Sequence, residues 1–403
     1  MFAQTFRTAT LEDVDRLVEI HTAAFPDDRG HTERRRNFLQ NALGTLDDLH
    51  VVLHEGRIVA HAFLFSLGAY FGAQRVSVGG IASVGVAPEA RRRGVASALL
   101  SHLQDVARSR GAVLSMLYAF RQSFYARHGY AAVSPQLRLL VDPRSIPPAW
   151  IAEATRSPLR AANGADRRAL EATYAYAAER STGWIERPRA LWDSKLLSPR
   201  IHGILLPRSG GLAGYVLLEH VQAELHAATR LLVHELVVED AAARRTLLGC
   251  LGAQADQVDE LELDVTVGDP LLFALEDADG RRHGTERLEH TLGTVASGPM
   301  LRVLDVAQAL EARGYGVATR VTVEVTGKLW DVDTRGERPR VTPVATEATA
   351  DLTLDATALA SVAFGALRVS DACALGLAQA APERKAELDA LFALAPFSVL
   401  DNF

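Results

Sequence analysis

Three consecutive arginines precede a glycine in the stretch VAPEARRRGVASALL, residues 86–100. The apolar run that ends at Val86 predicts a strand, and the leucines after Gly94 recur at helical spacing, so the arginines lie in a loop before a helix. The free backbone N–H groups of a helix N-terminus bind anions, and Gly94 lets the main chain approach a pyrophosphate. The stretch lacks both a Walker lysine and G-x-G-x-x-G. It predicts a pyrophosphate site of another kind, and the alternative is a solvated run of surface arginines.

The spacing Arg91-x-x-Gly94-x-Ala96 resembles the pyrophosphate arm of the GCN5-related N-acetyltransferase (GNAT) superfamily, whose members bind coenzyme A. The resemblance implies that acetyl-CoA lies between two strands, at residues 77–86 and 113–120, which splay apart. It also implies that main-chain groups at the end of the first strand hold the pantetheine amide and the thioester carbonyl. These are the groups of Val84, Gly85 and Val86.

A tyrosine stands in FYARHGY, after the second of these strands, where enzymes of this superfamily place one near the sulfur. Tyr125 is therefore the expected general acid. A thiol has a pKa near ~8.5 and a phenol near ~10, so proton transfer to the departing thiolate is close to balanced in a dry site. Tyr125 could instead be a core aromatic beside Phe124, and Tyr130 is better explained as packing in the last strand.

The general base is harder to place, because the strand VSVGGIASVGV contains no carboxylate and Ser83 is its only polar side chain near the end. The chain ends on APFSVLDNF, with four apolar residues where a frayed polar tail is usual. A terminus buried in the cleft would bring the α-carboxylate of Phe403 to the acceptor amine. Burial would raise its pKa above the ordinary value near ~3.5 and make it a better base. Asp401 could assist it or attract a cationic substrate.

The elements around these residues predict three parts, the first running to residue 145. It opens with a helix capped at Thr10 and continues with a hairpin that turns at Glu55-Gly56. Strand, helix, strand, short helix and a last strand, YAAVSPQLRLLV before Pro143, follow. This order is typical of a mixed α/β domain.

The second part, residues 146–288, resembles a degenerate duplicate of the first. Aligning Val86 with Val238 puts Arg93 on Arg245 but Gly94 on Thr246, so the copy is expected to have lost its coenzyme site. Chance similarity of two strand-then-helix units is the alternative. The third part, residues 289–403, predicts an α+β domain with the alternating strand TRVTVEVTGKLW and no catalytic cluster of its own.

Composition excludes several classes of protein. The 403 residues carry a formal charge of −6, which gives no footprint for nucleic acid or anionic lipid. Cys250 and Cys373 show no zinc or redox spacing, and no metal is expected. The early acids of the N-terminus do not fit a signal peptide, and no run is apolar enough to span a membrane. We expect a cytoplasmic protein.

The whole chain resembles the enhanced intracellular survival (Eis) family of acetyltransferases, through VAPEARRRGVASAL, FYARHGYAAVS, VAQALEARGYG and a terminal phenylalanine. The resemblance implies a catalytic GNAT domain, a degenerate GNAT domain and a sterol-carrier-protein-like domain, assembled as a hexamer. It implies that Tyr125 is the proton donor and the Phe403 carboxylate the proton acceptor. It also implies an acetyl-CoA site formed by Arg92, Arg93, Gly94, Val95, Ala96 and Ser97, with Phe120 and Arg121 near the thiol.

Members of this family acetylate amines of aminoglycosides, and some acetylate lysines. The residues expected to contact the acceptor amine are Asp27, Asp28, Glu33, Ser83 and Asp401. Family members often carry an acid just before the terminal phenylalanine, where this chain has Asn402. Two other functions stay open: acetylation of protein lysines or small polyamines, and a non-enzymatic carrier of apolar ligands built on the third domain.

Overall fold

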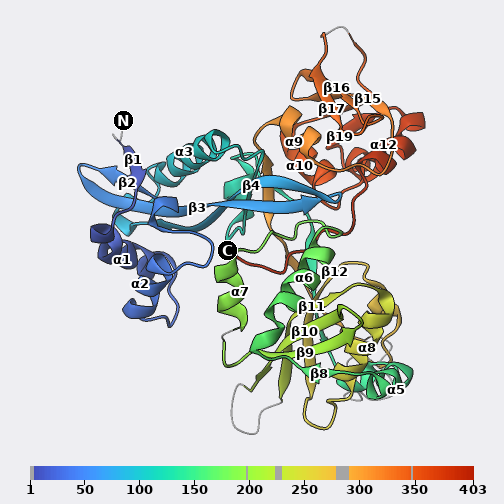
Figure 1. Ribbon diagram of the computed structural model, residues 1–403. Coiled ribbons are helices and arrows are strands. Elements are labelled where there is room, and N and C mark those ends of the chain that lie inside the picture. Colours follow the sequence, from blue (N-terminus) through green and yellow to red (C-terminus); the bar gives the residue numbers. More distant parts are fainter. Residues whose placement is uncertain (1–3, 197, 223–228, 278–289, 346–347) are drawn as a thin grey trace. The chain divides into compact units, whose positions relative to one another are not determined.

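The computed structural model describes residues 4–196, 198–222, 229–277, 290–345 and 348–403 (Figure 1). These residues form two compact units, each of which collects segments that are far apart in the sequence. The first unit comprises Met1–Ser134, Thr182–Ala190 and Pro299–Phe403, and the second comprises Pro135–Ser181 and Leu191–Gly298. Within the described residues, no helix is both long enough and apolar enough to cross a membrane.

The first unit contains a seven-stranded sheet with the order β1-β2-β3-β4-β5-β14-β6. Its strands are β1 (Thr5–Thr8), β2 (Leu49–His54), β3 (Arg57–Phe71), β4 (Gln74–Val86), β5 (Leu114–Leu117), β6 (Ala131–Ala132) and β14 (Met300–Val303). The hairpin between β2 and β3 turns at Glu55 and Gly56, both with positive φ, as predicted. Helix α3 (Val95–Ser109) covers one face of the sheet, and α1 (Val14–Ala24) and α2 (His31–Leu39) cover the other (Figure 1).

The two central parallel strands separate as expected. β4 and β5 pair over only four residues, from Val78 opposite Leu114 to Ile81 opposite Leu117. β5 then ends, whereas β4 continues to Val86 along β3. The predicted splay of residues 77–86 from residues 113–120 is confirmed.

The last strand predicted for the first part, YAAVSPQLRLLV, is divided between two sheets. Only β6 stays in the first sheet, where β14 separates it from β5. β7 (Pro135–Val141) pairs instead with β12 (Glu260–Thr266) and β13 (Gly293–Ser297) in the second unit. Pro135 has no N–H to donate, so it interrupts a ladder where the chain leaves the first sheet. The prediction of one continuous strand is wrong, because β7 joins the second sheet while β14 lies beside β5 in the first, an exchange of strands between the two sheets.

The second unit has its own seven-stranded sheet, with the order β13-β7-β12-β11-β10-β9-β8. Its remaining strands are β8 (Arg160–Ala161), β9 (His202–Arg208), β10 (Gly211–Val221) and β11 (Arg230–Val238). Its helices are α5 (Pro148–Arg156), α6 (Arg167–Ala178), α7 (Arg189–Leu196) and α8 (Ala241–Gly252). The first two residues of α7 belong to the first unit. β11 and β12 pair in parallel, as β4 and β5 do. A capping box precedes α6 at Asn163 and Asp166, just as Thr10 and Asp13 form one before α1. These shared features support a duplicated domain.

The third part of the chain forms a five-stranded sheet within the first unit, in the order β17-β16-β15-β18-β19. The strands are β15 (Arg320–Val325), β16 (Lys328–Asp333), β17 (Arg340–Pro343), β18 (Leu352–Leu354) and β19 (Ala378–Ala380); the helices are α9 (Val306–Ala312), α10 (Ala356–Ala363), α11 (Val369–Ala374) and α12 (Lys385–Phe392). The buried guanidinium of Arg313 donates to the carbonyls of Ala363 and Phe392. Since helix C-termini attract cations, Arg313 joins the ends of α10 and α12.

Candidate active site

The arginine loop joins the end of β4 to the start of α3. Arg91 holds it in place, because its guanidinium donates to the main-chain oxygen of Val86 at 3.2 Å and to that of Ala23 at 2.8 Å. Arg92 and Gly94 have φ angles of 59° and 77°, and Gly94 is the N-cap of α3. A Cβ on Gly94 would meet nothing within 4 Å. Glycine is therefore favoured here by the positive φ angle and not by a lack of space for a side chain. The space beside the N-terminus of the helix is open.

The first turn of α3 offers backbone donors to an anion. Within the part of the chain that the structure describes, no side chain caps the helix at Gly94. The N–H groups of the first turn therefore need partners from outside the helix. The side chains of Arg92 and Arg93 are exposed beside them, and the Ser97 hydroxyl is 3.1 Å from Nε2 of His128. Free donors, two cations and an unobstructed glycine fit a pyrophosphate.

Replacing Arg92 and Arg93 together by alanine is expected to raise the KM for acetyl-CoA roughly tenfold, because two charge-assisted contacts to phosphate would be lost. The loss should shrink at high salt, because salt screens exposed charges. Thiol release at varied acetyl-CoA concentration measures both effects. Arg57→Ala removes an exposed arginine from the start of β3 and serves as the control. An unchanged KM in the double variant would leave the arginines as a solvated surface run.

The end of β4 departs from regular pairing with β3. Ala82 lies opposite Phe63 and Gly85 opposite His61, so β4 carries one extra residue in this stretch. Ser83 has a φ of 54°, as expected at a bulge. Beyond Ile81 no described strand pairs with β4 on its β5 side. Main-chain groups at positions 84–86 are left there for a ligand, apart from the Val86 carbonyl, which accepts from Arg91.

Gly85→Ala is expected to reduce the free energy of unfolding by about 1–3 kcal/mol and to weaken acetyl-CoA binding, because a Cβ would lie 2.5 Å from Nε2 of the buried His61. In a His61→Ala background the same substitution should cost less, and denaturant unfolding of the four proteins measures this coupling. Gly30→Ala, where a Cβ meets nothing within 4 Å, is the control. Equal costs in both backgrounds would contradict the clash.

Tyr125 lies on the short helix α4 (Gln122–Ala126) and is 2% exposed. Its ring meets those of Phe120, Phe124 and Tyr130 nearly edge-on, with centroids 5.0–6.1 Å apart. Burial, and then the neighbouring Tyr130, raise the pKa of the Tyr125 phenol to about 12. The phenol therefore keeps its proton at neutral pH, as a general acid must. Phe120 and Arg121, expected at the thiol end of the coenzyme, are exposed beside it.

The C-terminal segment is held within the first unit. Phe397 is 1% exposed and lies 6.3 Å from the ring of Phe71. The next residue, Ser398, donates its N–H to the carbonyl of Thr182 at 3.0 Å and accepts at its hydroxyl from Nε1 of Trp184 at 2.9 Å. The apolar ending therefore packs against the protein, as the sequence predicts.

The last residue lies on the α1/α2 face of the sheet. A Cβ on Gly79 would come within 2.9 Å of Ala107 on α3, whereas one on Gly80 would come within 3.0 Å of the Phe403 ring. Successive strand residues face opposite sides, so Phe403 lies across the sheet from α3. Its ring centroid is 6.4 Å from that of Phe65 and 5.5 Å from that of Tyr118. Phe403 therefore lies one residue short of the point where β4 and β5 part.

Comparison with known proteins agrees with this geometry. Residues 5–133 and residues 183–303 each match an acetyltransferase (GNAT) domain family, and residues 306–397 match the sterol carrier protein domain family. The N-acetyltransferase Eis of Mycobacterium tuberculosis (strain ATCC 25177 / H37Ra) is 29% identical over 313 residues, which cover 72% of this chain and 71% of that protein. The chain is therefore an N-acetyltransferase with two GNAT domains, and it is similar to the Eis proteins.

Solved structures share the fold of this chain over its full length. Eis1 from Mycobacterium abscessus superposes with a TM-score of 0.78 at 23% identity, covering 100% of both chains. A GCN5-related N-acetyltransferase from Anabaena variabilis gives a TM-score of 0.84 at 22% identity, again over 100% of both chains. Two GNAT domains followed by a sterol-carrier-protein-like domain are therefore the architecture of this enzyme, as predicted.

Two of the acids expected to contact the acceptor are already paired with arginines. The Asp401 carboxylate is buried against Arg187 at 2.8 Å, which contradicts a role in attracting substrate. Asp27 pairs with Arg29 and with the buried Arg34, each at 2.5 Å, and the bond from Arg29 is the main cause that lowers its pKa to about 2. The charge of Asp27 is therefore already neutralised by arginines, which makes it a poor partner for a cationic substrate. The other three expected residues are placed as follows: Asp28 and Glu33 are exposed, and Ser83 is the partly exposed bulge residue.

The second GNAT domain lacks the arginine loop altogether. β11 ends at Val238 and α8 begins at Ala241, so two residues replace the eight between Val86 and Val95. The carboxylate of Asp240 caps α8 by accepting from the N–H of Ala243 at 2.8 Å. The short loop and the acidic cap at the helix N-terminus are a physical reason to expect no coenzyme site in this domain. The alignment of Thr246 with Gly94 is wrong, because Thr246 lies inside α8.

Sequence reasoning missed the residues that hold the C-terminal segment and those behind β4. Arg187 and Trp184 come from STGWIERPRA, and the apolar Trp-Ile pair in that polar stretch was the only signal. His61 lies behind Gly85, and the structure shows no hydrogen-bond partner for either ring nitrogen among the described residues. Burial lowers the pKa of His61 to about 3, so the ring stays neutral.

Proposed function

We propose that this chain transfers the acetyl group of acetyl-CoA to a primary amine of a polyamine-type acceptor such as an aminoglycoside. The observation that carries the proposal is the position of Phe403, whose ring lies between Phe65 and Tyr118 where β4 and β5 separate. The α-carboxylate of this residue is our candidate for the general base that the strand itself does not supply. Tyr125, buried and protonated, is our candidate for the general acid.

Transfer is direct, in a ternary complex. The Phe403 carboxylate, alone or through water, accepts a proton from the acceptor ammonium or from the attacking amine. The nitrogen forms a bond to the acetyl carbon, and main-chain N–H groups at residues 84–86 stabilise the oxyanion. The C–S bond then breaks, and Tyr125 gives its proton to the sulfur. Arg92, Arg93 and the first turn of α3 hold the pyrophosphate throughout.

A cationic acceptor suits the acids that are still exposed. Asp28 lies in the loop before α2 and Glu33 in the first turn of that helix, and both are exposed. Among the described residues, neither forms an ion pair like those of Asp27. The formal charge of −6 also favours a cation. By family resemblance we further propose that the enzyme is cytoplasmic and that it forms a homo-hexamer. Sedimentation of the purified protein tests the hexamer.

The deciding experiment measures the release of coenzyme A thiol from acetyl-CoA with aminoglycosides, linear polyamines and a lysine peptide, and counts added acetyl groups by mass spectrometry. More than one acetyl group on an aminoglycoside supports the proposal. Release with the peptide or small amines alone would keep the mechanism and change the acceptor. No release with any of them would overturn the proposed acceptor classes.

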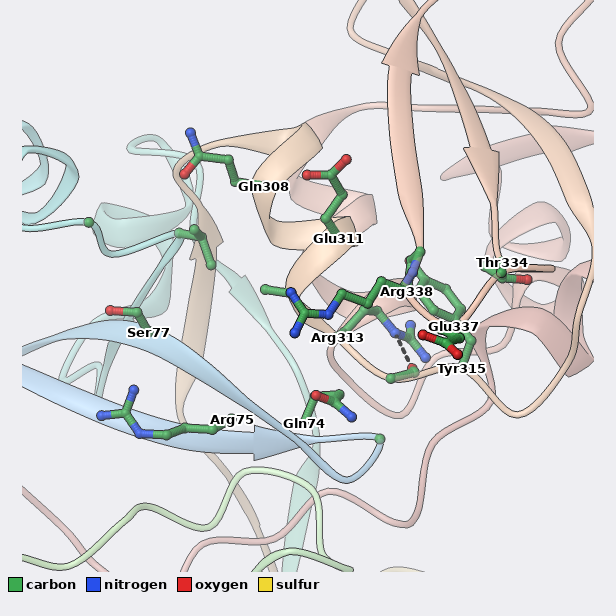
Figure 2. Close-up of a pocket in the computed structure, with 17 residues that line it drawn as sticks. Gln74, Arg75, Ser77, Gln308, Glu311, Arg313, Tyr315, Thr334, Glu337 and Arg338 are labelled. Carbon is green, nitrogen blue, oxygen red and sulfur yellow. Dashed lines mark hydrogen bonds between the residues drawn. The ribbon is translucent and has the colours of Figure 1, made fainter.

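The carrier function gains no support from the cavity beside the third domain. A cavity of about 790 Å³ lies between the β3–β4 turn, α9 and the loop after β16 (Figure 2). An apolar ligand needs a mostly apolar wall. The side chains around this cavity are instead largely polar or charged, among them Gln74, Arg75, Gln308, Glu311, Glu337 and Arg338.

A further inference from the structure

The segment Thr182–Arg187 connects β3 to the C-terminal segment. On one side, the N–H of Gly183 donates to the carbonyl of Tyr70 at 2.9 Å and the N–H of Glu186 donates to that of Gly68 at 2.8 Å. On the other, Thr182 forms a parallel bridge with Phe397. The segment thus fastens the chain's last residues to the strand that carries Phe65. We call Thr182–Arg187 the clamp.

The clamp ends in a buried ion pair two residues before Phe403. Nε of Arg187 donates to Oδ2 of Asp401 at 2.8 Å, and the two side chains are 0% and 2% exposed. Tyr118 adds a second hold, since its hydroxyl donates to the main-chain oxygen of Asp401 at 3.2 Å. Asp401 is thereby fixed through both its side chain and its main chain.

A buried ion pair is weak evidence for stability, because desolvation of the two charges offsets their attraction, but it restricts geometry strongly. Only Asn402 separates the fixed Asp401 from Phe403. The clamp therefore limits where the last residue and its carboxylate can lie. A catalytic group gains rate from such restriction, since a small displacement costs a large factor.

We propose that Arg187 is a positioning residue for acetyl transfer, which acts through Asp401 to hold Phe403 at the acceptor amine. The proposal rests on the proposed function, because it gives the Phe403 carboxylate the role of base. The Arg187 side chain is 0% exposed, so its proposed role is indirect. Its loss should lower kcat and leave the acetyl-CoA site, formed by the arginine loop and α3, unchanged.

The test uses the full chain with Arg187→Met, which keeps the length of the side chain and removes its charge, and with Arg187→Lys. Arg75→Met is the matched control, because Arg75 pairs with clamp residue Glu186 at 2.6 Å but both side chains are more than half exposed. Arg187→Met should lower kcat at least tenfold with an unchanged KM for acetyl-CoA. The kcat of Arg187→Lys should lie between those of Arg187→Met and wild type. The kcat of Arg75→Met should stay within twofold of wild type.

A second readout follows the C-terminal segment directly. Carboxypeptidase should release Phe403 faster from Arg187→Met than from wild type or Arg75→Met. Because Arg187→Met leaves Asp401 buried without this partner, Arg187→Met/Asp401→Asn is included. It should fold but not recover kcat, and recovery would show that the ion pair serves stability alone.

The two proposals fail in different ways. A wild-type protein that releases no thiol with any acceptor overturns the proposed function, and carboxypeptidase then tests the clamp by itself. A kcat within twofold of wild type in Arg187→Met overturns the positioning role in an active enzyme. Equal release of Phe403 from Arg187→Met and wild type overturns the clamp in either case.

Discussion

Three glycines added after Phe403 are expected to lower kcat by about 10²-fold or more while the dissociation constant of acetyl-CoA stays the same. A positioned general base contributes roughly 10²–10⁴-fold to a proton-transfer step, and the extension moves the carboxylate by three residues and puts an amide in its place. The proposed pyrophosphate site is at the arginine loop and the first turn of α3, and the extension changes neither. Thiol release and calorimetric titration with acetyl-CoA measure the two quantities separately, on protein whose intact mass fixes its last residue.

The control for added length inserts the same three glycines between Gly210 and Gly211, in the turn between β9 and β10. Phe403→Tyr controls for the ring, because it keeps both an aromatic side chain and the carboxylate. The kcat of both control proteins should stay within a few-fold of the wild-type value. If the extended protein also does so, the carboxylate is not the base, and water on the bulged end of β4 takes that place.

Local patterns predicted the elements that form the proposed coenzyme site. Val95, Leu99, Leu100 and Leu103 lie on the buried side of α3, and the loop before it opens on Gly94 with the positive φ that glycine favours. These features depend on neighbours in sequence, such as helical spacing, a strand end and a glycine. The family resemblance added the splay between β4 and β5, which the register confirms.

Long-range partners could not be predicted in the same way. Arg187 and Asp401 are 214 residues apart, and nothing in the spacing of either says that the other exists. Asp401 therefore looked like a free acid near the terminus, although the fold buries it. The strand exchange has a similar cause: β7 alternates as a strand should, but periodicity does not tell which of two similar sheets a strand joins.

Tyr125→Phe is expected to lower kcat by about 10²-fold, because it removes the proton donated to the departing sulfur and keeps the ring that packs on Phe124. Tyr130→Phe is the matched control. The Tyr130 hydroxyl lies 2.8 Å from the Ser115 hydroxyl in the buried core, so its loss should cost about 1 kcal/mol of unfolding free energy and little rate. A Tyr125→Phe enzyme within twofold of wild type would assign the proton to another donor.

The pH dependence of wild-type kcat follows from the direction of the Tyr125 shift. Burial raises the pKa of the phenol to about 12, so proton loss begins at higher pH than for an exposed tyrosine. The donor is then fully protonated up to about pH 10, and kcat should not fall between pH 7 and that limit. Burial in the same site would also raise the pKa of a leaving thiolate, which would reduce the difference in pKa between the phenol and the thiol. A descending limb near pH 8–9 that disappears in Tyr125→Phe would contradict this, since it would mean that the phenol ionises more easily in the folded site than in water.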